Sequence, residues 1–236
     1  MESVGGVAIH TGTIPSKALR EAVIAVTGAR NIVEGIEDSI SSRETRLVRL
    51  TEACRRVIKT ETDLIRSQLI GNGIEIIRGV GSLVDQHTVQ ADGPRGVERI
   101  NADHILIATG TTPARPRDIP FDSTNVITSD ELLNMQSLPR TMIVVGGGVI
   151  GTEYASMLAA LGVRVTLLEA RPRLLEFIDP EISEALQYHL RQMGCTLRLG
   201  EKVVSIKQID APRGARSADQ KLVQATLESG KTLVAD

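Results

Sequence analysis

A glycine pattern in the second half of the chain has the spacing of a phosphate-binding turn. Gly146, Gly148 and Gly151 follow the apolar run 141–145 and open a segment with helical patterning. In such a turn the first glycine permits a tight bend, the second lets backbone approach a pyrophosphate, and the third lets helix and strand pack closely. The helix N-terminus offers unpaired N–H groups and a positive dipole to phosphates. The pattern predicts a dinucleotide site formed by Gly146, Gly147, Gly148, Val149, Ile150 and Gly151.

An acidic residue at the end of the next apolar run would complete this site. Glu169 follows Gly151 at roughly the 20-residue interval that separates the glycine turn from a ribose-binding carboxylate. A carboxylate there favours the free 2′-hydroxyl of NAD and repels the 2′-phosphate of NADP. Arg171 and Arg173 come directly afterwards; they either offset that repulsion or are solvated loop residues. The sequence therefore leaves both NAD and NADP as ligands.

The composition excludes some other classes of function. The 236 residues include 27 Lys and Arg against 29 Asp and Glu, a net charge of −2, whereas nucleic-acid binders carry a basic excess. With no Trp, 2 Tyr and 2 Phe there are few rings on which bases could stack. We therefore expect no nucleic-acid partner, and an aliphatic core suited to buried parallel strands.

Membrane, disulfide and metal sites are not expected either. No apolar run reaches the roughly 18 to 20 residues that a membrane helix needs, and the N-terminus lacks the features of a signal peptide. Cys54 and Cys195 are too far apart in sequence to suggest a disulfide framework, and Cys54 falls on the apolar stripe of a predicted helix. The four histidines show no ligand spacing. These features predict a cytoplasmic protein without a membrane partner or a metal.

The hydrophobic periodicity predicts an α/β fold: Rossmann-like domains with parallel sheets, plus a small β-hairpin or meander. A connector with Pro113, Pro116 and Pro120 separates the expected domains, residues 1–118 and 119–236. Helices are expected at 13–29, 43–69, 130–134 and 149–161, and after Asp179 and Pro180. Strands are expected at 74–79, 81–84, 88–90, 104–108, 141–145, 163–169, 196–199, 203–208, 222–228 and 232–235, with a hairpin loop at 211–220.

Three ordered motifs resemble those of the two-dinucleotide flavoprotein disulfide reductases, which include dihydrolipoamide dehydrogenase, glutathione reductase and mercuric reductase. Residues 5–17, GGVAIHTGTIPSK, are similar to their active-site segment, residues 108–111, ATGT, to their FAD-contacting turn, and residues 146–153 to their NAD(P) loop. The resemblance covers essentially the whole chain. It implies FAD as a cofactor, contacted by Gly6, Thr13, Lys17, Gly81, Thr109, Gly110 and Thr111.

The chain departs from this group at its redox cysteines. Ala8 and Thr13 occupy the positions of the two cysteines, so no dithiol can form beside a flavin. The soluble, FAD-containing pyridine nucleotide transhydrogenases have lost the second cysteine and carry the run GTIPSK found at residues 12–17. That branch keeps the first cysteine, so Ala8 is an additional departure. The resemblance favours a transhydrogenase over a dihydrolipoamide dehydrogenase-like reductase.

The resemblance also implies a mechanism. NADPH would pass hydride to N5 of FAD and leave, and NAD would then bind at the same site and take the hydride. Lys17 would lie near N5 and pair with Glu153, which flanks the nicotinamide; the alternative is that both are solvent-exposed helix residues. Arg171 and Val203 are further candidates for contact with the cofactors.

The resemblance corresponds to about half of an enzyme. In the family a glycine-rich βαβ unit that binds FAD would precede Gly5, and a second FAD turn and a dimer-forming domain would follow Asp236. We therefore expect weak FAD binding, exposed apolar surface in residues 1–118, and NAD(H) binding by the second domain. The longer family form would be a homodimer. The remaining alternative is a non-catalytic NAD(H)-binding fragment.

Overall fold

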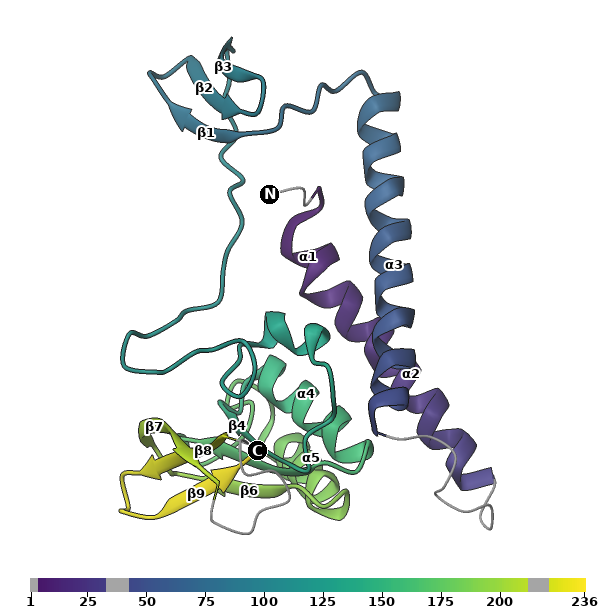
Figure 1. The fold of residues 1–236 in the computed structure, drawn as a ribbon, viewed down its shortest axis with the longest axis vertical. Coiled ribbons are helices and arrows are strands. Elements are labelled where there is room, and N and C mark those ends of the chain that lie inside the picture. The colour runs from purple at the N-terminus through teal and green to yellow at the C-terminus, as the bar shows by residue number, and fades with distance from the viewer. Residues whose placement is uncertain (1–3, 33–42, 212–220) are drawn as a thin grey trace. The chain divides into compact units, whose positions relative to one another are not determined.

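The computed structural model describes residues 4–32, 43–211 and 221–236, and the chain divides into two compact units. The first unit contains Met1–Ala18 and Cys54–Thr112, and the second contains Leu19–Ala53 and Pro113–Asp236. Figure 1 labels their elements. The chain passes between the units after Ala18, after Ala53 and after Thr112. The last of these points lies directly before the predicted connector, and the domain boundary at 118/119 stays a prediction.

The first unit combines helical segments with an antiparallel meander. Its elements are α1 (Gly6–His10), the start of α2 (Thr13–Ile32), the end of α3 (Arg43–Gly71), β1 (Val80–Leu83), β2 (Thr88–Gly93) and β3 (Gly96–Asn101). Pro15 lies in the first turn of α2, where its missing N–H has no intrahelical acceptor to lose. The Cys54 thiol of α3 contacts the Pro15 carbonyl at 3.8 Å and is 1% exposed, so its predicted role as a core residue is confirmed.

The second unit contains a parallel and an antiparallel sheet. Its elements are the rest of α2, the start of α3, η1 (Ser129–Asn134), β4 (Thr141–Val145), α4 (Val149–Ala160), β5 (Arg164–Glu169), α5 (Pro180–Gln192), β6 (Thr196–Leu199), β7 (Val203–Asp210), β8 (Lys221–Leu227) and β9 (Thr232–Ala235). The order β4-β5-β6 is parallel, with α4 and α5 as the crossovers, and β7-β8-β9 is antiparallel. Asp179 caps α5 by accepting from the Glu181 N–H at 2.9 Å. The predicted Rossmann-type α/β fold is confirmed.

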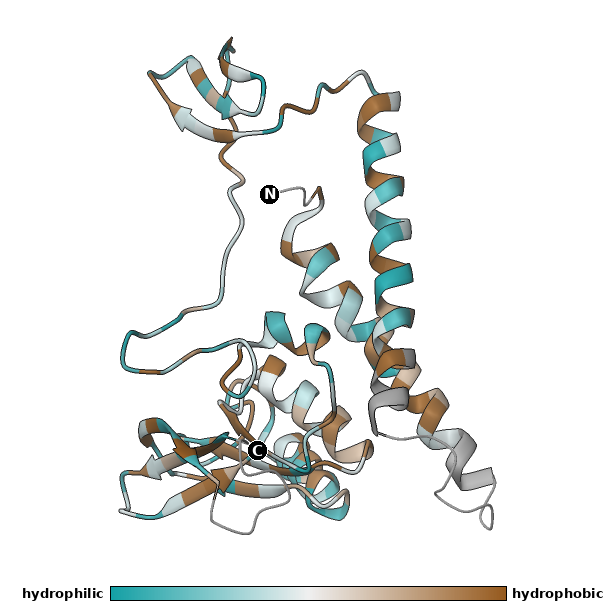
Figure 2. Ribbon diagram, in the orientation of Figure 1, coloured by the Kyte–Doolittle hydropathy of each residue, from teal (hydrophilic) through white to brown (hydrophobic). Residues whose placement is uncertain are grey.

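The core of the second unit is centred on β5. Leu167 and Leu168 are 0% and 1% exposed, and successive strand residues point to opposite faces of a sheet. Leu168 packs with Ala225 and Leu227 of β8, so the antiparallel sheet covers one face of the parallel sheet. Ile143, Val203 and Leu233 pack against this cluster. In Figure 2 the strands β7 to β9 carry brown, hydrophobic stretches that alternate with paler or teal ones.

Two predicted strands are absent from the described chain. Residues 74–79 and 104–108 have no strand pairing, and Leu106 and Ile107 are 91% and 67% exposed. An apolar run becomes a strand only where another strand completes its hydrogen-bond ladder, and none does so here. The predicted exposure of apolar surface in this unit is confirmed by these two residues. Conversely, α1 and β3 had no predicted counterpart, and residues 212–220 of the predicted hairpin loop lie outside the described residues.

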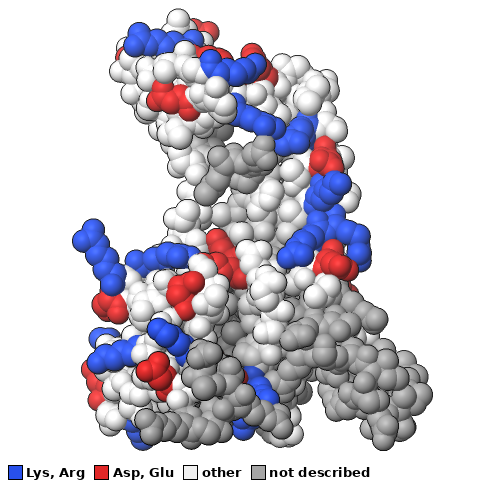
Figure 3. All heavy atoms as spheres, in the orientation of Figure 1, with Lys and Arg blue, Asp and Glu red and all other residues white. Residues whose placement is uncertain are grey.

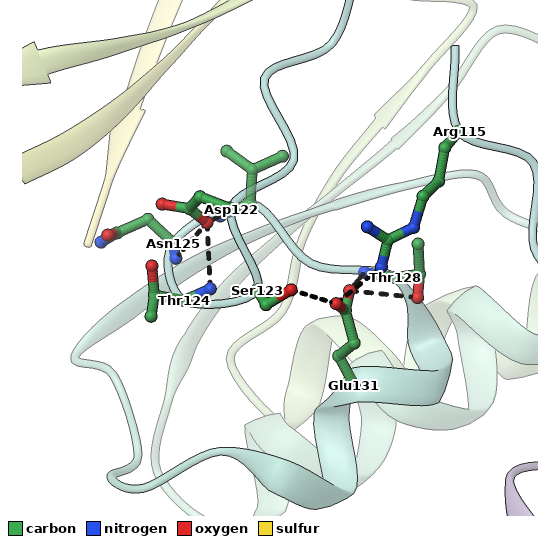
Figure 4. A network of polar contacts seen from close by, with 8 residues as sticks. Arg115, Asp122, Ser123, Thr124, Asn125, Thr128 and Glu131 are labelled. Carbon is green, nitrogen blue, oxygen red and sulfur yellow. Dashed lines mark hydrogen bonds and ion pairs between the residues drawn. The ribbon is translucent and has the colours of Figure 1, made fainter. Parts of the chain in front are cut away.

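The connector is held to the second unit by the polar network in Figure 4. Glu131 accepts hydrogen bonds from Arg115 Nη2 at 2.6 Å and from Ser123 Oγ at 2.5 Å. Its other oxygen accepts from the Thr128 backbone N–H at 2.8 Å, which completes the capping box of η1. Asp122 accepts from three consecutive backbone N–H groups, those of Thr124, Asn125 and Val126.

Charged residues of both signs lie side by side on the face shown in Figure 3. The ion pairs of the described residues include Arg20 with Glu21 at 3.0 Å and Lys231 with the partly buried Glu201 at 3.3 Å. In the part of the chain that the structure describes, no helix is both long enough and apolar enough to cross a bilayer. The same residues hold no group of three or more His, Cys, Asp or Glu able to bind a metal ion.

Candidate nucleotide-binding site

The turn between β4 and α4 presents the start of a helix to solvent. Gly146 has a φ of 109°, which only glycine adopts readily, and its N–H donates to the Leu168 carbonyl at 2.8 Å. Helix α4 begins at Val149. Its N-cap residue is Gly148, which has no side chain that could cap the helix. The first N–H groups of a helix have no intrahelical acceptor. Val149 and Ile150 are 59% and 58% exposed, so this helix start is accessible to a ligand.

Gly148 and Gly151 of the motif have different surroundings. A Cβ on Gly151 would overlap the carbonyl oxygen of Gly146, so only glycine permits this packing of helix against turn. A Cβ on Gly148 would have no atom within 4 Å. In a phosphate-binding turn the second glycine leaves room for the phosphate and the third allows close packing of the helix. The open space at Gly148 and the close contact at Gly151 agree with these two roles.

The backbone N–H and carbonyl of Gly147 are hydrogen-bonded to the last residue of β5 and to the loop that follows it. Its N–H donates to Glu169 Oε2 at 2.6 Å, and its carbonyl accepts from the Leu175 N–H at 3.1 Å. A Cβ on Gly147 would lie 2.5 Å from Leu174 Cδ2. The fully buried Leu174 is itself fixed by its carbonyl, which accepts from Ser183 Oγ at 2.6 Å. These contacts orient the glycine turn.

Leu174, Leu175 and Ser183 were not predicted as site residues. The apolar periodicity of α5 gives no indication that a serine, 1% exposed here, anchors the loop after β5. Leu175 has a φ of 47°, a left-handed conformation that leucine seldom adopts and that its sequence context does not indicate.

Glu169 lies at the end of β5 as predicted and is 6% exposed. Besides Gly147, it accepts from Arg171 three times: from the backbone N–H at 2.9 Å, from Nε at 2.9 Å and from Nη2 at 3.1 Å. The Arg171 side chain is the main cause that lowers the pKa of Glu169 to about 2; burial opposes it, and the two backbone N–H donors add to it. The carboxylate is therefore ionised at neutral pH.

A cavity of about 710 Å³ adjoins the glycine turn within the second unit. It runs along β4, where Met142, Ile143, Val144 and Val145 line it, and reaches the start of α4. The remaining wall includes residues of the connector, η1, β7, β8 and β9, together with Tyr154 of α4. Its volume and largely apolar lining are typical of small-molecule sites. Val203 lies instead in the core cluster with Leu168, and its contact with a nucleotide stays a prediction.

The predicted FAD residues lie on separate elements of the first unit. Gly6 begins α1, Thr13 begins α2, Lys17 lies one turn further along α2, and Gly81 lies in β1. Thr109, Gly110 and Thr111 lie in the exposed segment after β3, next to the absent strand 104–108. Their contacts with FAD stay predictions.

The predicted pair of Lys17 and Glu153 also stays a prediction. Lys17 is exposed on α2 in the first unit, whereas Glu153 lies on α4 in the second unit. Ala8 lies on α1 and Thr13 on α2, at the two positions that hold cysteines in the family that the chain resembles. The two cysteines of this chain are Cys54 and Cys195, and burial raises the pKa of both thiols. Neither cysteine has the exposed, thiolate-favouring surroundings of a redox-active residue.

Residues 2–236 match the family described as pyridine nucleotide-disulphide oxidoreductase. The chain belongs to this family. It is 45% identical over 206 residues to a soluble pyridine nucleotide transhydrogenase of Mycobacterium bovis (strain BCG / Pasteur 1173P2), covering 86% of this chain and 44% of the relative. A relative of the same description from Marinobacter nauticus is 38% identical over 234 residues, covering 99% of this chain and 48% of the relative. The chain thus spans about half the length of the curated relatives it matches.

Solved structures of this family have the same fold. LpdA from Mycobacterium tuberculosis superposes with a TM-score of 0.81 at 26% identity, covering 99% of this chain and 49% of LpdA. The HOCl-induced flavoprotein disulfide reductase RclA from Escherichia coli superposes, as its Cu(II) complex, with a TM-score of 0.78 at 27% identity, covering all of this chain and 47% of RclA.

Proposed function

We propose that this chain forms the NAD(H)- and NADP(H)-binding part of a soluble, FAD-dependent pyridine nucleotide transhydrogenase. The observation that carries the proposal is the turn between β4 and α4, where Gly148 faces open space, Gly151 allows close packing, and Glu169 ends the next strand. The relatives named transhydrogenases support it.

Each part of a dinucleotide has a suitable region in the second unit. The pyrophosphate would accept hydrogen bonds from N–H groups at the start of α4, where the helix dipole also favours negative charge. The adenosine ribose would lie at Glu169. The nicotinamide would extend along β4 into the cavity of about 710 Å³, whose apolar lining excludes water from the ring.

FAD would supply the hydride relay between the two nucleotides when it is bound in the whole enzyme. In the proposal, the ammonium of Lys17 adds positive charge beside the flavin, and Glu153 orients Lys17 and borders the nicotinamide. The homodimer of the longer family form and a cytoplasmic location also belong to this proposal. Sedimentation of a full-length form and cell fractionation would test those two statements.

A dihydrolipoamide dehydrogenase-like reductase is the less suitable alternative. That reaction needs two cysteines beside the flavin, and Ala8 and Thr13 stand at their positions. Cys54 and Cys195 are 1% and 4% exposed, which prevents either from reaching a dithiol substrate without unfolding.

Fluorescence titration of the purified chain with NADH and with NADPH tests the binding claim. We expect saturable binding of both nucleotides, and at least ~10-fold weaker binding by Gly148→Ala, whose methyl group would project toward the phosphate. Absence of binding would refute the proposal. An absorption spectrum before and after NADPH tests the redox claim: a flavin band that bleaches and returns with NAD supports a transhydrogenase. Nucleotide binding by a colourless protein would favour a non-catalytic NAD(H)-binding role.

A further inference from the structure

Arg171 is hydrogen-bonded to the carboxylate of Glu169, the group that would bind the adenosine ribose in the proposed site. Four hydrogen bonds reach Glu169, from the Gly147 N–H and from the N–H, Nε and Nη2 of Arg171. A carboxylate has about four acceptor positions, so this one is saturated by the protein itself. A ribose hydroxyl can donate to Glu169 only after a donor has left.

The two partners of this ion pair differ in freedom to move. The side chain of Glu169 is 6% exposed, whereas that of Arg171 is 47% exposed. The guanidinium therefore lies on the solvent side of the pair and can turn into water, while the carboxylate stays in place. A guanidinium carries five N–H donors, and only those on Nε and Nη2 are used on Glu169. Its remaining donors are available to a second anion.

We propose that Arg171 is a specificity-determining residue that lets one ribose site accept both nucleotides by exchanging partners. With NADP(H), Arg171 stays on Glu169 and its other N–H groups bind the 2′-phosphate, which offsets the repulsion between phosphate and carboxylate. With NAD(H), Arg171 turns into solvent and the 2′-hydroxyl donates to Glu169. This inference rests on the proposed function.

The exchange predicts that the two nucleotides respond in opposite directions when Arg171 is removed. NADP(H) loses charge-assisted hydrogen bonds, and its affinity should fall by ~10- to 100-fold in Arg171→Gln. NAD(H) no longer has to displace the guanidinium, and its affinity should rise by about 2- to 5-fold, the factor expected for one displaced ion pair whose arginine is solvent-exposed. Arg171→Lys keeps the charge but loses the planar fork, so its NADP(H) affinity should be intermediate.

The experiment measures dissociation constants for NADH and NADPH by fluorescence titration of the full chain and of Arg171→Gln and Arg171→Lys. Arg164→Gln is the matched control, because this substitution removes the same charge at an exposed residue. Arg164 lies at the opposite end of β5 from Glu169. The expected result is weaker NADPH binding with tighter NADH binding in Arg171→Gln alone.

Other outcomes overturn the inference in distinguishable ways. If Arg171→Gln changes both affinities by the same factor, or weakens NADH, Arg171 does not exchange partners although the nucleotide site stands. If Arg164→Gln gives the same pattern, the effect is one of net charge. If the unmodified chain binds neither nucleotide, the proposed function fails and this inference fails with it.

Discussion

A Cβ atom on Gly151 would overlap the carbonyl oxygen of Gly146, so the turn and the helix of the proposed nucleotide-binding site touch through backbone alone. Gly148, between them, has no neighbour within 4 Å of its own Cβ position. Gly151 is thus needed for the packing of the helix against the turn, and we propose that Gly148 gives a ligand access to the turn.

The variants Gly151→Ala and Gly148→Ala should separate these two roles. Gly151→Ala forces the helix away from the turn, and overpacking of this kind costs about 1–3 kcal/mol of unfolding free energy. Gly148→Ala should unfold like the unmodified chain, because its φ of −78° suits alanine, but should bind NADH at least ~10-fold more weakly. Urea denaturation and NADH titration of both variants check this. Equal stability of the two would contradict the packing argument.

Glu169 should contribute to stability in a pH-dependent way. Its pKa is lowered from 4.5 to about 2 in the folded chain, mainly by the Arg171 side chain. A carboxyl group with a lowered pKa stabilises the fold above its unfolded value and loses that contribution as pH falls toward the folded value. Glu169→Gln should therefore lower the unfolding free energy by about 1–3 kcal/mol at pH 7 and by less at pH 3.

Urea denaturation at the two pH values measures this difference. Glu184→Gln, an exposed position on α5, is the control and should change stability little at either pH. If Glu169→Gln lowers the unfolding free energy as much at pH 3 as at pH 7, the ionised carboxylate is not the stabilising group.

Glu131 should hold the connector to the second unit. Hydrogen bonds from Ser123 and Thr128 and the neighbouring Arg115 lower the pKa of Glu131 to about 2. Glu131→Gln keeps the shape but removes the charge, so we expect faster proteolysis of residues 113–128 and a loss of about 1–2 kcal/mol of unfolding free energy. Limited proteolysis followed by mass spectrometry checks this. Asp118→Asn makes the same charge change at an exposed connector residue, and equal cleavage of the two variants would count against the network.

The two thiols should be inert in the folded chain. Cys54 and Cys195 are buried, and burial raises the pKa of each thiol, which disfavours the reactive thiolate. We expect a thiol reagent at pH 8 to label neither residue before denaturant is added, and both afterwards. Replacing both by alanine should leave NADH affinity within about 2-fold, because neither lies on the glycine turn. Fast labelling of the native chain would contradict this.

The second unit was predicted well because its signals are local. Gly146, Gly148 and Gly151 carry their own backbone requirements, and strands 141–145, 196–199 and 232–235 match β4, β6 and β9. Asp179 and Pro180 likewise mark the start of α5 through capping chemistry that needs no distant partner. Glu169 at the end of β5 followed from the regular length of a βαβ unit.

Other features depended on which segments meet in three dimensions. Residues 104–108 have the composition of a strand, yet no neighbour supplies a hydrogen-bond ladder, and Leu106 stays 91% exposed. The loop after β5 folds back on the glycine turn. This fold brings Arg171 into hydrogen bonds with Glu169 and lets the Leu175 N–H donate to the Gly147 carbonyl. Local residue types determine where a chain bends and which face it buries. Pairing between distant segments decides which strands form and which charges meet, because those free energies arise only on contact.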